Sequence, residues 1–271
     1  MFFDKIKESV DVIQSKINRK PKIGIILGSG LGNLVDIMED KEIIAYQDIV
    51  NFPLSKVEGH QGNLVFGRLG NQELVVMQGR FHYYEGFTMK EVTYPIYVMK
   101  LLGVEYLIVT NACGGINRSF EPGDLMIIDD FINSVGNNPL IGENDERFGP
   151  RFPDMSEPYD TELRDKAEMI AKGLGIHPQH GVYTLFQGPY YETAAEIRMF
   201  ERMGADAVGM STVPETIVAN YLGIKTLGIA CITNMATGIR KDKHSHAEVL
   251  KIANAASEKL CRWVEELIRQ W

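Results

Sequence analysis

The chain has 271 residues, 45% of them hydrophobic and 24% charged, which is typical of a globular protein that can bury a large core. Its formal net charge is −8, and an acidic chain without a basic block is a poor candidate for binding nucleic acid. Three widely spaced cysteines, Cys113, Cys231 and Cys261, argue against a disulfide framework and a zinc site, so we expect a cytoplasmic protein.

The first third of the chain predicts a helix, a buried strand and a hairpin. Residues 3–18 carry apolar side chains at helical spacing, and their charges leave no apolar signal-peptide core. Lys22–Leu27 is an apolar run typical of a buried strand. Leu64–Leu69 and Leu74–Gln78 then flank Gly70-Asn71, which is a two-residue hairpin signal.

The remainder predicts helices that alternate with strands. Helices are expected over Thr88–Leu102, over Leu163–Leu174, from Thr193 to about Met203, from Pro214 to Gly223, and from Ser245 to Trp271. Strands are expected over Tyr106–Thr110, Ala207-Val208 and Lys225–Thr233. The longest stretch without Asp, Glu, Lys or Arg contains prolines, glutamines and histidines, so no membrane span is expected.

This alternation, with a hairpin in the first half, predicts an α/β fold whose sheet is mostly parallel with an antiparallel part. No linker rich in Pro, Gly or Ser divides the chain, which favours a single domain. In such sheets ligands bind beyond the carboxyl ends of the strands. Polar, glycine-rich segments follow the predicted strands at Leu27, Met77, Thr110, Val208 and Thr233, so one pocket could collect them all.

The most informative of these segments runs from Arg80 to Gly86. Arg80, His82 and Tyr84 share one side of an extended chain, which places a guanidinium, an imidazole and a phenol together. Such a guanidinium suits a phosphate in bidentate fashion. Gly28-Ser29-Gly30 could also cradle a phosphate through its backbone N–H groups, although a plain strand-to-helix turn explains it equally well.

The other polar positions each allow two interpretations. Glu192 could favour the positive end of the next helix or could read a base, and Ser211 could cap a helix or bind phosphate. His60 lies between glycines, and His246 falls in the first turn of the last helix, where a neutral imidazole is expected. Cys113 carries no sign of an activated thiolate, and no His, Cys, Asp or Glu set has metal-ligand spacing.

Six motifs, in order, make the chain resemble the trimeric purine nucleoside phosphorylases over nearly its whole length. They are GSGLG, RFHYYEG, NACGG, GPYYETAAE, GADAVGMSTVPE and ITN. The resemblance implies one domain over residues 1–271, with a twisted mixed sheet surrounded by helices. It also implies a purine nucleoside and orthophosphate as substrates, a homotrimer, and no metal or organic cofactor. From the composition, as above, we expect no membrane and no nucleic-acid partner.

The resemblance assigns roles to individual residues. The positions that match the phosphate site are Ser29, His60, Arg80, His82, Ala112 and Ser211. Those that match the sugar site are Tyr84, Met210 and His246, with Phe152 supplied by a neighbouring subunit. Those that match the base site are Tyr191, Glu192 and Asn234, and the catalytic set comprises Asn234, Glu192, His82 and His246.

Two positions depart from the mammalian pattern. Tyr191 stands where mammalian relatives usually carry Phe, and the stretch from Asn234 to His246 is shorter. The choice of His246 over His244 therefore depends on the capping pattern that begins at Ser245 and fixes His246 at the helix start.

The chemistry expected of these residues is phosphorolysis of inosine- and guanosine-type nucleosides to a free base and a (deoxy)ribose 1-phosphate. A bound phosphate would stabilise an oxocarbenium-like sugar and then attack it. Asn234 would donate to the purine N7 or O6, and an ionised Glu192 would accept from N1–H, which adenine lacks. Three alternatives remain: a methylthioadenosine phosphorylase, a non-catalytic nucleotide-binding domain, and a nucleoside hydrolase, which would call for an Asp-rich calcium site.

Overall fold

Apolar runs and amphipathic segments alternate along the chain, and they form nine strands and six α-helices within the described residues. The computed structural model describes residues 1–28, 32–54, 61–240 and 245–271. The strands are β1 (Ile23–Ile26), β2 (Glu39–Ala45), β3 (Asn63–Leu69), β4 (Gln72–Gln78), β5 (Tyr106–Gly115), β6 (Leu125–Asn133), β7 (Gln179–Leu185), β8 (Ala207–Gly209) and β9 (Lys225–Met235). The helices are α1 (Phe2–Lys16), α2 (Met89–Leu102), α3 (Thr161–Gly173), α4 (Ala194–Arg202), α5 (Val213–Tyr221) and α6 (His246–Arg269).

The strands form one mixed sheet in the order β2-β3-β4-β1-β5-β8-β7-β6-β9. The strand β1 pairs parallel with β4 and with β5, and β5 pairs parallel with β9. The pairs β2–β3 and β3–β4 are antiparallel. Because β9 also pairs with β5, the strands β5, β8, β7, β6 and β9 close into a ring. The predicted α/β fold with a twisted mixed sheet is confirmed.

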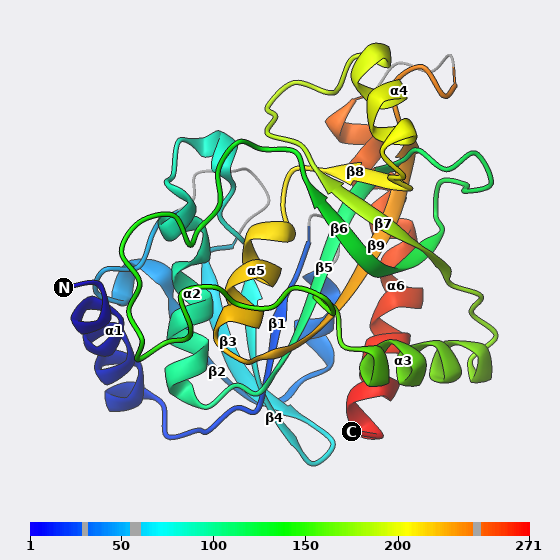
Figure 1. Cartoon of the computed structure of the whole chain (residues 1–271). Helices are drawn as coiled ribbons and strands as arrows, with labels where there is room; N and C mark the ends of the chain where they lie inside the picture. The colour runs from blue at the N-terminus through cyan, green and yellow to red at the C-terminus, as the bar shows by residue number, and fades with distance from the viewer. Residues whose placement is uncertain (29–31, 55–60, 241–244) are drawn as a thin grey trace.

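Helices cover both faces of the sheet. The helices α1, α2 and α5 lie on one face, while α3 and α6 pack on the other (Figure 1). On the first face, Ile13, Val98 and Val218 are buried in one apolar cluster with Val109 of β5. On the second face the fully buried Trp263 donates its Nε1–H to the carbonyl of Ala167 at 2.8 Å, which joins α6 to α3. Burial of each such large side chain stabilises the fold by about 1.5–3 kcal/mol.

Side-chain caps determine where several helices begin. Thr88 and Thr193 form capping boxes with Glu91 and Glu196 at the starts of α2 and α4. The Ser245 hydroxyl accepts from the backbone N–H of Glu248 at 3.2 Å, as the sequence predicted for α6. These bonds satisfy N–H groups that the first turn of a helix leaves without a partner.

The sequence prediction misses three strands and shortens a fourth. The strands β2, β6 and β7 were not predicted, and β5 continues five residues beyond Thr110 to Gly115. β2 is an edge strand with several charged, exposed residues, so it lacks the apolar alternation that marks a half-buried strand. The added end of β5 carries the segment Asn111–Gly115, which pairs with both β9 and β8.

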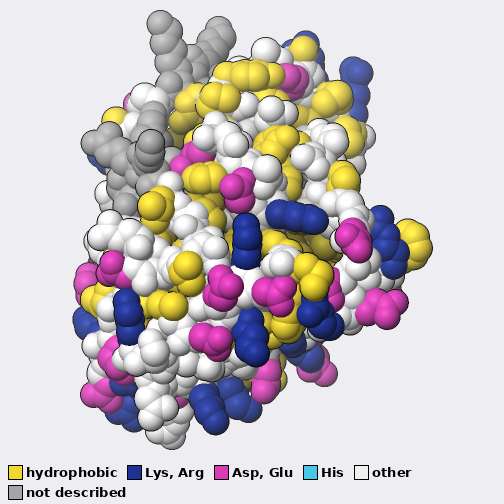
Figure 2. Space-filling view, turned by 90° about the vertical axis from the view of Figure 1, so that its left-hand side faces the viewer, with side chains coloured by type: hydrophobic (Ala, Val, Ile, Leu, Met, Phe, Trp, Pro, Cys, Tyr) yellow, Lys and Arg dark blue, Asp and Glu magenta, His cyan; other side chains and the backbone are white. Residues whose placement is uncertain are grey.

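The surface is mixed in charge on the face that α1 forms. Figure 2 shows that lysine and arginine side chains are interspersed with acidic ones on the described part of this face. Among the described residues, no helix is both long and apolar enough to cross a membrane.

Candidate active site

A cleft opens where the carboxyl ends of several strands meet, as the positions of the polar segments predicted. Residues far apart in the sequence converge there because the parallel strands β1, β4, β5 and β9 run toward this edge, and β8 pairs antiparallel with the end of β5 beside them. The cleft is lined by Gly28, Arg80, His82, Tyr84, Asn111, Ala112, Cys113, Gly114, Tyr191, Glu192, Val208, Gly209, Met210, Ser211, Thr233, Asn234 and Val249.

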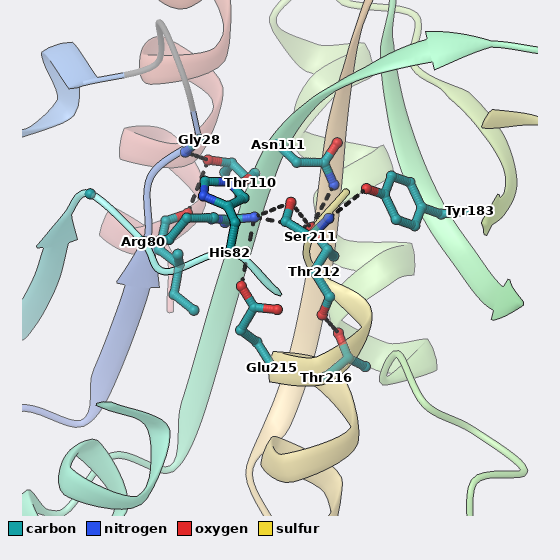
Figure 3. Close-up of polar contacts among 12 residues, drawn as sticks. Gly28, Arg80, His82, Thr110, Asn111, Tyr183, Ser211, Thr212, Glu215 and Thr216 are labelled. Atoms are coloured by element: carbon teal, nitrogen blue, oxygen red, sulfur yellow. Dashed lines mark hydrogen bonds and ion pairs between the residues drawn. The ribbon is translucent and has the colours of Figure 1, made fainter. Parts of the chain in front are cut away.

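Arg80 follows β4 and is almost completely buried, with 2% of the residue exposed. Its Nη1 donates to the Ser211 hydroxyl at 2.6 Å and to the Thr212 hydroxyl at 3.2 Å, and its Nη2 donates to the Thr110 carbonyl at 2.6 Å (Figure 3). The guanidinium is therefore fixed between β5 and the start of α5. A fixed, desolvated guanidinium beside a hydroxyl forms a strong anion-binding group.

Thr212 holds this arrangement together from an unusual backbone conformation. Its φ of 77° lies in the left-handed region, which costs a β-branched residue free energy on the order of 1–3 kcal/mol. Its hydroxyl takes part in hydrogen bonds with Arg80 and with the amide of Asn111, the latter at 2.8 Å. The Tyr183 hydroxyl accepts the backbone N–H of Ser211 at 3.4 Å, which orients the neighbouring turn.

His82 is held by Glu85 and by Tyr84. The Glu85 carboxylate accepts the backbone N–H of His82 at 2.8 Å and lies 3.2 Å from the ring Nδ1. The His82 and Tyr84 rings stack with their centroids 4.7 Å apart. These contacts orient the imidazole, and burial raises the pKa of the Tyr84 phenol to about 12, so this hydroxyl stays neutral.

Glycine is required at Gly28, where β1 approaches β5. A Cβ at Gly28 would lie 2.7 Å from the Asn111 Cα, which is too close for any other residue. The Gly28 N–H instead donates to the Thr110 hydroxyl at 3.0 Å. Gly28 and the Arg80 guanidinium thus both bond to Thr110, the first to its hydroxyl and the second to its carbonyl.

Glu192 and Asn234 form a second polar region of the cleft. Glu192 is 6% exposed, and burial raises the pKa of its carboxyl to about 7. The Asn234 amide is oriented at both ends, because its oxygen accepts from Thr233 at 3.0 Å and its nitrogen donates to the Met235 carbonyl at 3.4 Å. A carboxylate and an oriented amide can together read the edge of a purine.

Cys113 lies in the cleft wall but is poorly suited to act as a nucleophile. Burial raises the pKa of its thiol well above the usual range, so the thiolate is suppressed. Among the described residues, no group of three or more His, Cys, Asp or Glu side chains could hold a metal ion.

The structure brings together most of the predicted site residues. The ones that line the cleft are Arg80, His82, Tyr84, Ala112, Tyr191, Glu192, Met210, Ser211 and Asn234. Ser29, His60 and the alternative His244 lie outside the described residues. His246 is the first residue of α6, and its side chain is likewise outside what is described, while Val249 of the same helix lines the cleft.

Phe152 is not among the residues that line this cleft. It lies in a loop, and 87% of its surface is exposed in the single chain. The residues that the sequence interpretation missed are Thr212, Tyr183 and Glu215. The Thr212 hydroxyl accepts from Arg80, the Tyr183 hydroxyl accepts the backbone N–H of Ser211, and the Glu215 carboxylate lies 3.8 Å from Arg80 (Figure 3). The strained φ of Thr212 leaves no signal in the sequence.

Comparison with known proteins gives consistent matches over nearly the whole chain. The model of the phosphorylase superfamily matches residues 22–269. Purine nucleoside phosphorylase 1 of Geobacillus stearothermophilus is 54% identical over 264 residues, covering 97% of this chain and 96% of the relative. The crystal structure of Schistosoma mansoni purine nucleoside phosphorylase in complex with inosine is similar with a TM-score of 0.95 at 43% identity, covering 99% of this chain and 96% of that one. The structure of the Schistosoma mansoni enzyme in complex with adenosine gives a TM-score of 0.94 at 44% identity, with 98% and 97% covered.

Proposed function

The chain belongs to the phosphorylase superfamily, and from this we propose that it is a purine nucleoside phosphorylase. It would cleave inosine- and guanosine-type nucleosides, ribo or 2'-deoxy, with orthophosphate to give the free purine and (deoxy)ribose 1-phosphate. The observation that supports this most strongly is that one cleft contains both the Arg80–Ser211 pair and the Glu192–Asn234 pair. The first pair suits an anion, and the second suits the edge of a 6-oxopurine.

The phosphate would bind beside Arg80, with Ser211, His82 and the backbone N–H of Ala112 as further ligands. Ser29 and His60 are proposed to complete this group. An oxyanion held here lies close to the sugar as it gains positive charge, and it is positioned to attack the anomeric carbon. The nearly complete burial of Arg80 strengthens this electrostatic effect, because little water competes for the charge.

The base would bind between Tyr191, Glu192 and Asn234. The purine gains negative charge as it leaves, and the Asn234 amide can donate to N7 or O6. An ionised Glu192 can accept from N1–H, and from the 2-amino group of guanine. Adenine has no N1–H, so the same carboxylate would face a lone pair, and sites of this kind discriminate by roughly 10⁴-fold or more.

The sugar would lie over Tyr84 and Met210, with His246 and a Phe152 from a neighbouring subunit closing the site. This role would explain why an 87% exposed phenylalanine occupies a loop, since leaving it in water costs about 1.5–3 kcal/mol relative to burial. We therefore propose a homotrimer with a ring-closing interface. We further propose that the enzyme needs no metal or organic cofactor and works in the cytoplasm, where its three free cysteines stay reduced.

The decisive experiment is cleavage of inosine with and without orthophosphate, followed by detection of ribose 1-phosphate. The proposal requires that cleavage depend on phosphate, and equal rates in phosphate-free buffer would refute it. Methylthioadenosine and adenosine are run in parallel. Turnover has to be measured, because a related enzyme has been crystallised with adenosine and binding alone does not separate the substrates.

A further inference from the structure

Glu215 lies in the first turn of α5, beneath Arg80, and its role is not explained by the proposed substrate contacts. Its Oε1 is 3.8 Å from the Arg80 Nη1, and both side chains are only 3% exposed. This distance permits an ion pair but is too long for a hydrogen bond. Neither carboxylate oxygen of Glu215 has a hydrogen-bond partner among the described residues. A carboxylate buried in this way is costly unless an opposite charge lies nearby.

The hydrogen bonds that orient Arg80 come from neutral groups instead. Ser211 and Thr110 accept from its two terminal nitrogens at 2.6 Å each. Of the described acidic side chains, Glu215 is the one within ion-pair distance of Arg80. Figure 3 shows Glu215 reaching the guanidinium from α5, on the side away from Gly28 and Asn111, which line the cleft. Glu215 is thus placed to act on Arg80 by its charge rather than by a bond.

We propose that Glu215 is a positioning residue that balances the charge of Arg80 and thereby lowers the affinity of the cleft for phosphate groups. This inference rests on the proposed function, because it assigns Arg80 to the phosphate. When the site is empty, the carboxylate stabilises the buried guanidinium. When a phosphate binds on the other side of Arg80, the carboxylate repels it.

The proposed consequence for catalysis concerns release. Orthophosphate and the sugar phosphate product carry the same anionic group, so Arg80 attracts both. An attraction that is equally strong for substrate, transition state and product does not speed the chemical step. It does slow departure of the product. By weakening this attraction, the Glu215 carboxylate would speed release of the sugar phosphate and so allow the next catalytic cycle.

The test is Glu215→Gln, which keeps the size of the side chain and removes its charge. Orthophosphate binding is measured by calorimetry, and the KM values for phosphate and inosine are measured by steady-state kinetics. The proposal predicts that phosphate binds more tightly, on the order of tenfold, which is about 1.4 kcal/mol. The KM for inosine should change by less than about twofold, because the charge acts on Arg80 and not on the base.

The sign of the change separates this role from a structural one. Damage to the packing beneath Arg80 would weaken phosphate binding, whereas loss of the opposing charge strengthens it. The matched control is Thr216→Val, which disturbs the neighbouring buried hydroxyl, bonded to Thr212 and Tyr159, without changing any charge. Its phosphate affinity should not increase.

Unchanged or weaker phosphate binding in Glu215→Gln overturns the proposal, as does equal tightening in Thr216→Val. If Glu215→Gln does not fold, Glu215→Asp replaces it, because the shorter side chain keeps the charge but moves it farther from Arg80. That variant should tighten phosphate binding by a smaller factor, about two- to threefold, and no tightening would again overturn the proposal. A wild-type enzyme that ignores phosphate would instead refute the proposed function, so the two failures are distinguishable.

Discussion

Lowering the pH should weaken the binding of 6-oxopurines through protonation of Glu192. Burial raises the pKa of this carboxyl from 4.5 to about 7. The ionised form accepts the purine N1–H in a charge-assisted hydrogen bond, which is stronger than the bond to the protonated carboxyl. With a pKa of about 7, the ionised fraction falls roughly tenfold between pH 8 and pH 6. The dissociation constant for hypoxanthine should therefore rise by up to about the same factor.

The assay is calorimetric titration of free hypoxanthine at several values between pH 6 and pH 8. Phosphate is left out, because orthophosphate itself changes charge within this pH range and would obscure the result. The matched variant is Glu192→Gln, which carries no titratable group at this position and should show a flat profile. A flat profile in the wild type, or the same slope in Glu192→Gln, would refute the role given to this carboxyl.

The remaining predictions test the other parts of the cleft and the assembly. Arg80→Ala should raise the KM for phosphate roughly 100-fold, through loss of charge-assisted hydrogen bonds, while calorimetry shows hypoxanthine binding little changed; an equal loss of both would make Arg80 structural. Asn234→Asp should lower the guanosine-to-adenosine ratio of kcat/KM, because a carboxyl can accept from a 6-amino group, and an unchanged ratio contradicts the base-reading role. Phe152→Ala and Glu192→Ala, each nearly inactive, should regain activity when mixed trimers form, whereas no recovery would mean that Phe152 serves its own chain. Glu192→Gln should raise the thermal midpoint at pH 8 but much less at pH 5. Because the pKa of Glu192 is higher in the folded state, this group contributes most stability below its unfolded pKa of 4.5. That contribution is lost as the pH rises through the folded pKa of about 7, where the wild type carries a buried charge and the variant does not.

The convergence of Arg80 and Asn234 on one cleft was predictable because both come at the ends of apolar strands. Arg80 and Asn234 are polar side chains at the ends of buried runs, and the carboxyl ends of such strands meet at one edge of the sheet. Glu215 could not be predicted in the same way. An acidic residue in the first turn of a helix is ordinarily explained by the helix dipole, and nothing in the sequence links it to Arg80, 135 residues away.

The strands that could not be predicted from the sequence are stabilised by pairing with segments far away along the chain. β6 joins four apolar residues to two aspartates, and it pairs with β9, about 100 residues later. The glycines at the end of β5 favour a turn when read locally, yet pairing with β8 and β9 keeps this segment extended. Local periodicity therefore predicted the helices and the hairpin but not how the sheet closes.

The ring of five strands also sets when the cleft can form as the chain leaves the ribosome. The strands β1 to β5 are complete by Gly115, so five of the nine described strands come from less than half of the chain. The ring closes only when β9 arrives at Lys225–Met235, and β9 delivers Asn234 to the cleft in the same step. A nascent or truncated chain lacking β9 would therefore carry Arg80 and Glu192 without Asn234, and the proposed base site would be incomplete.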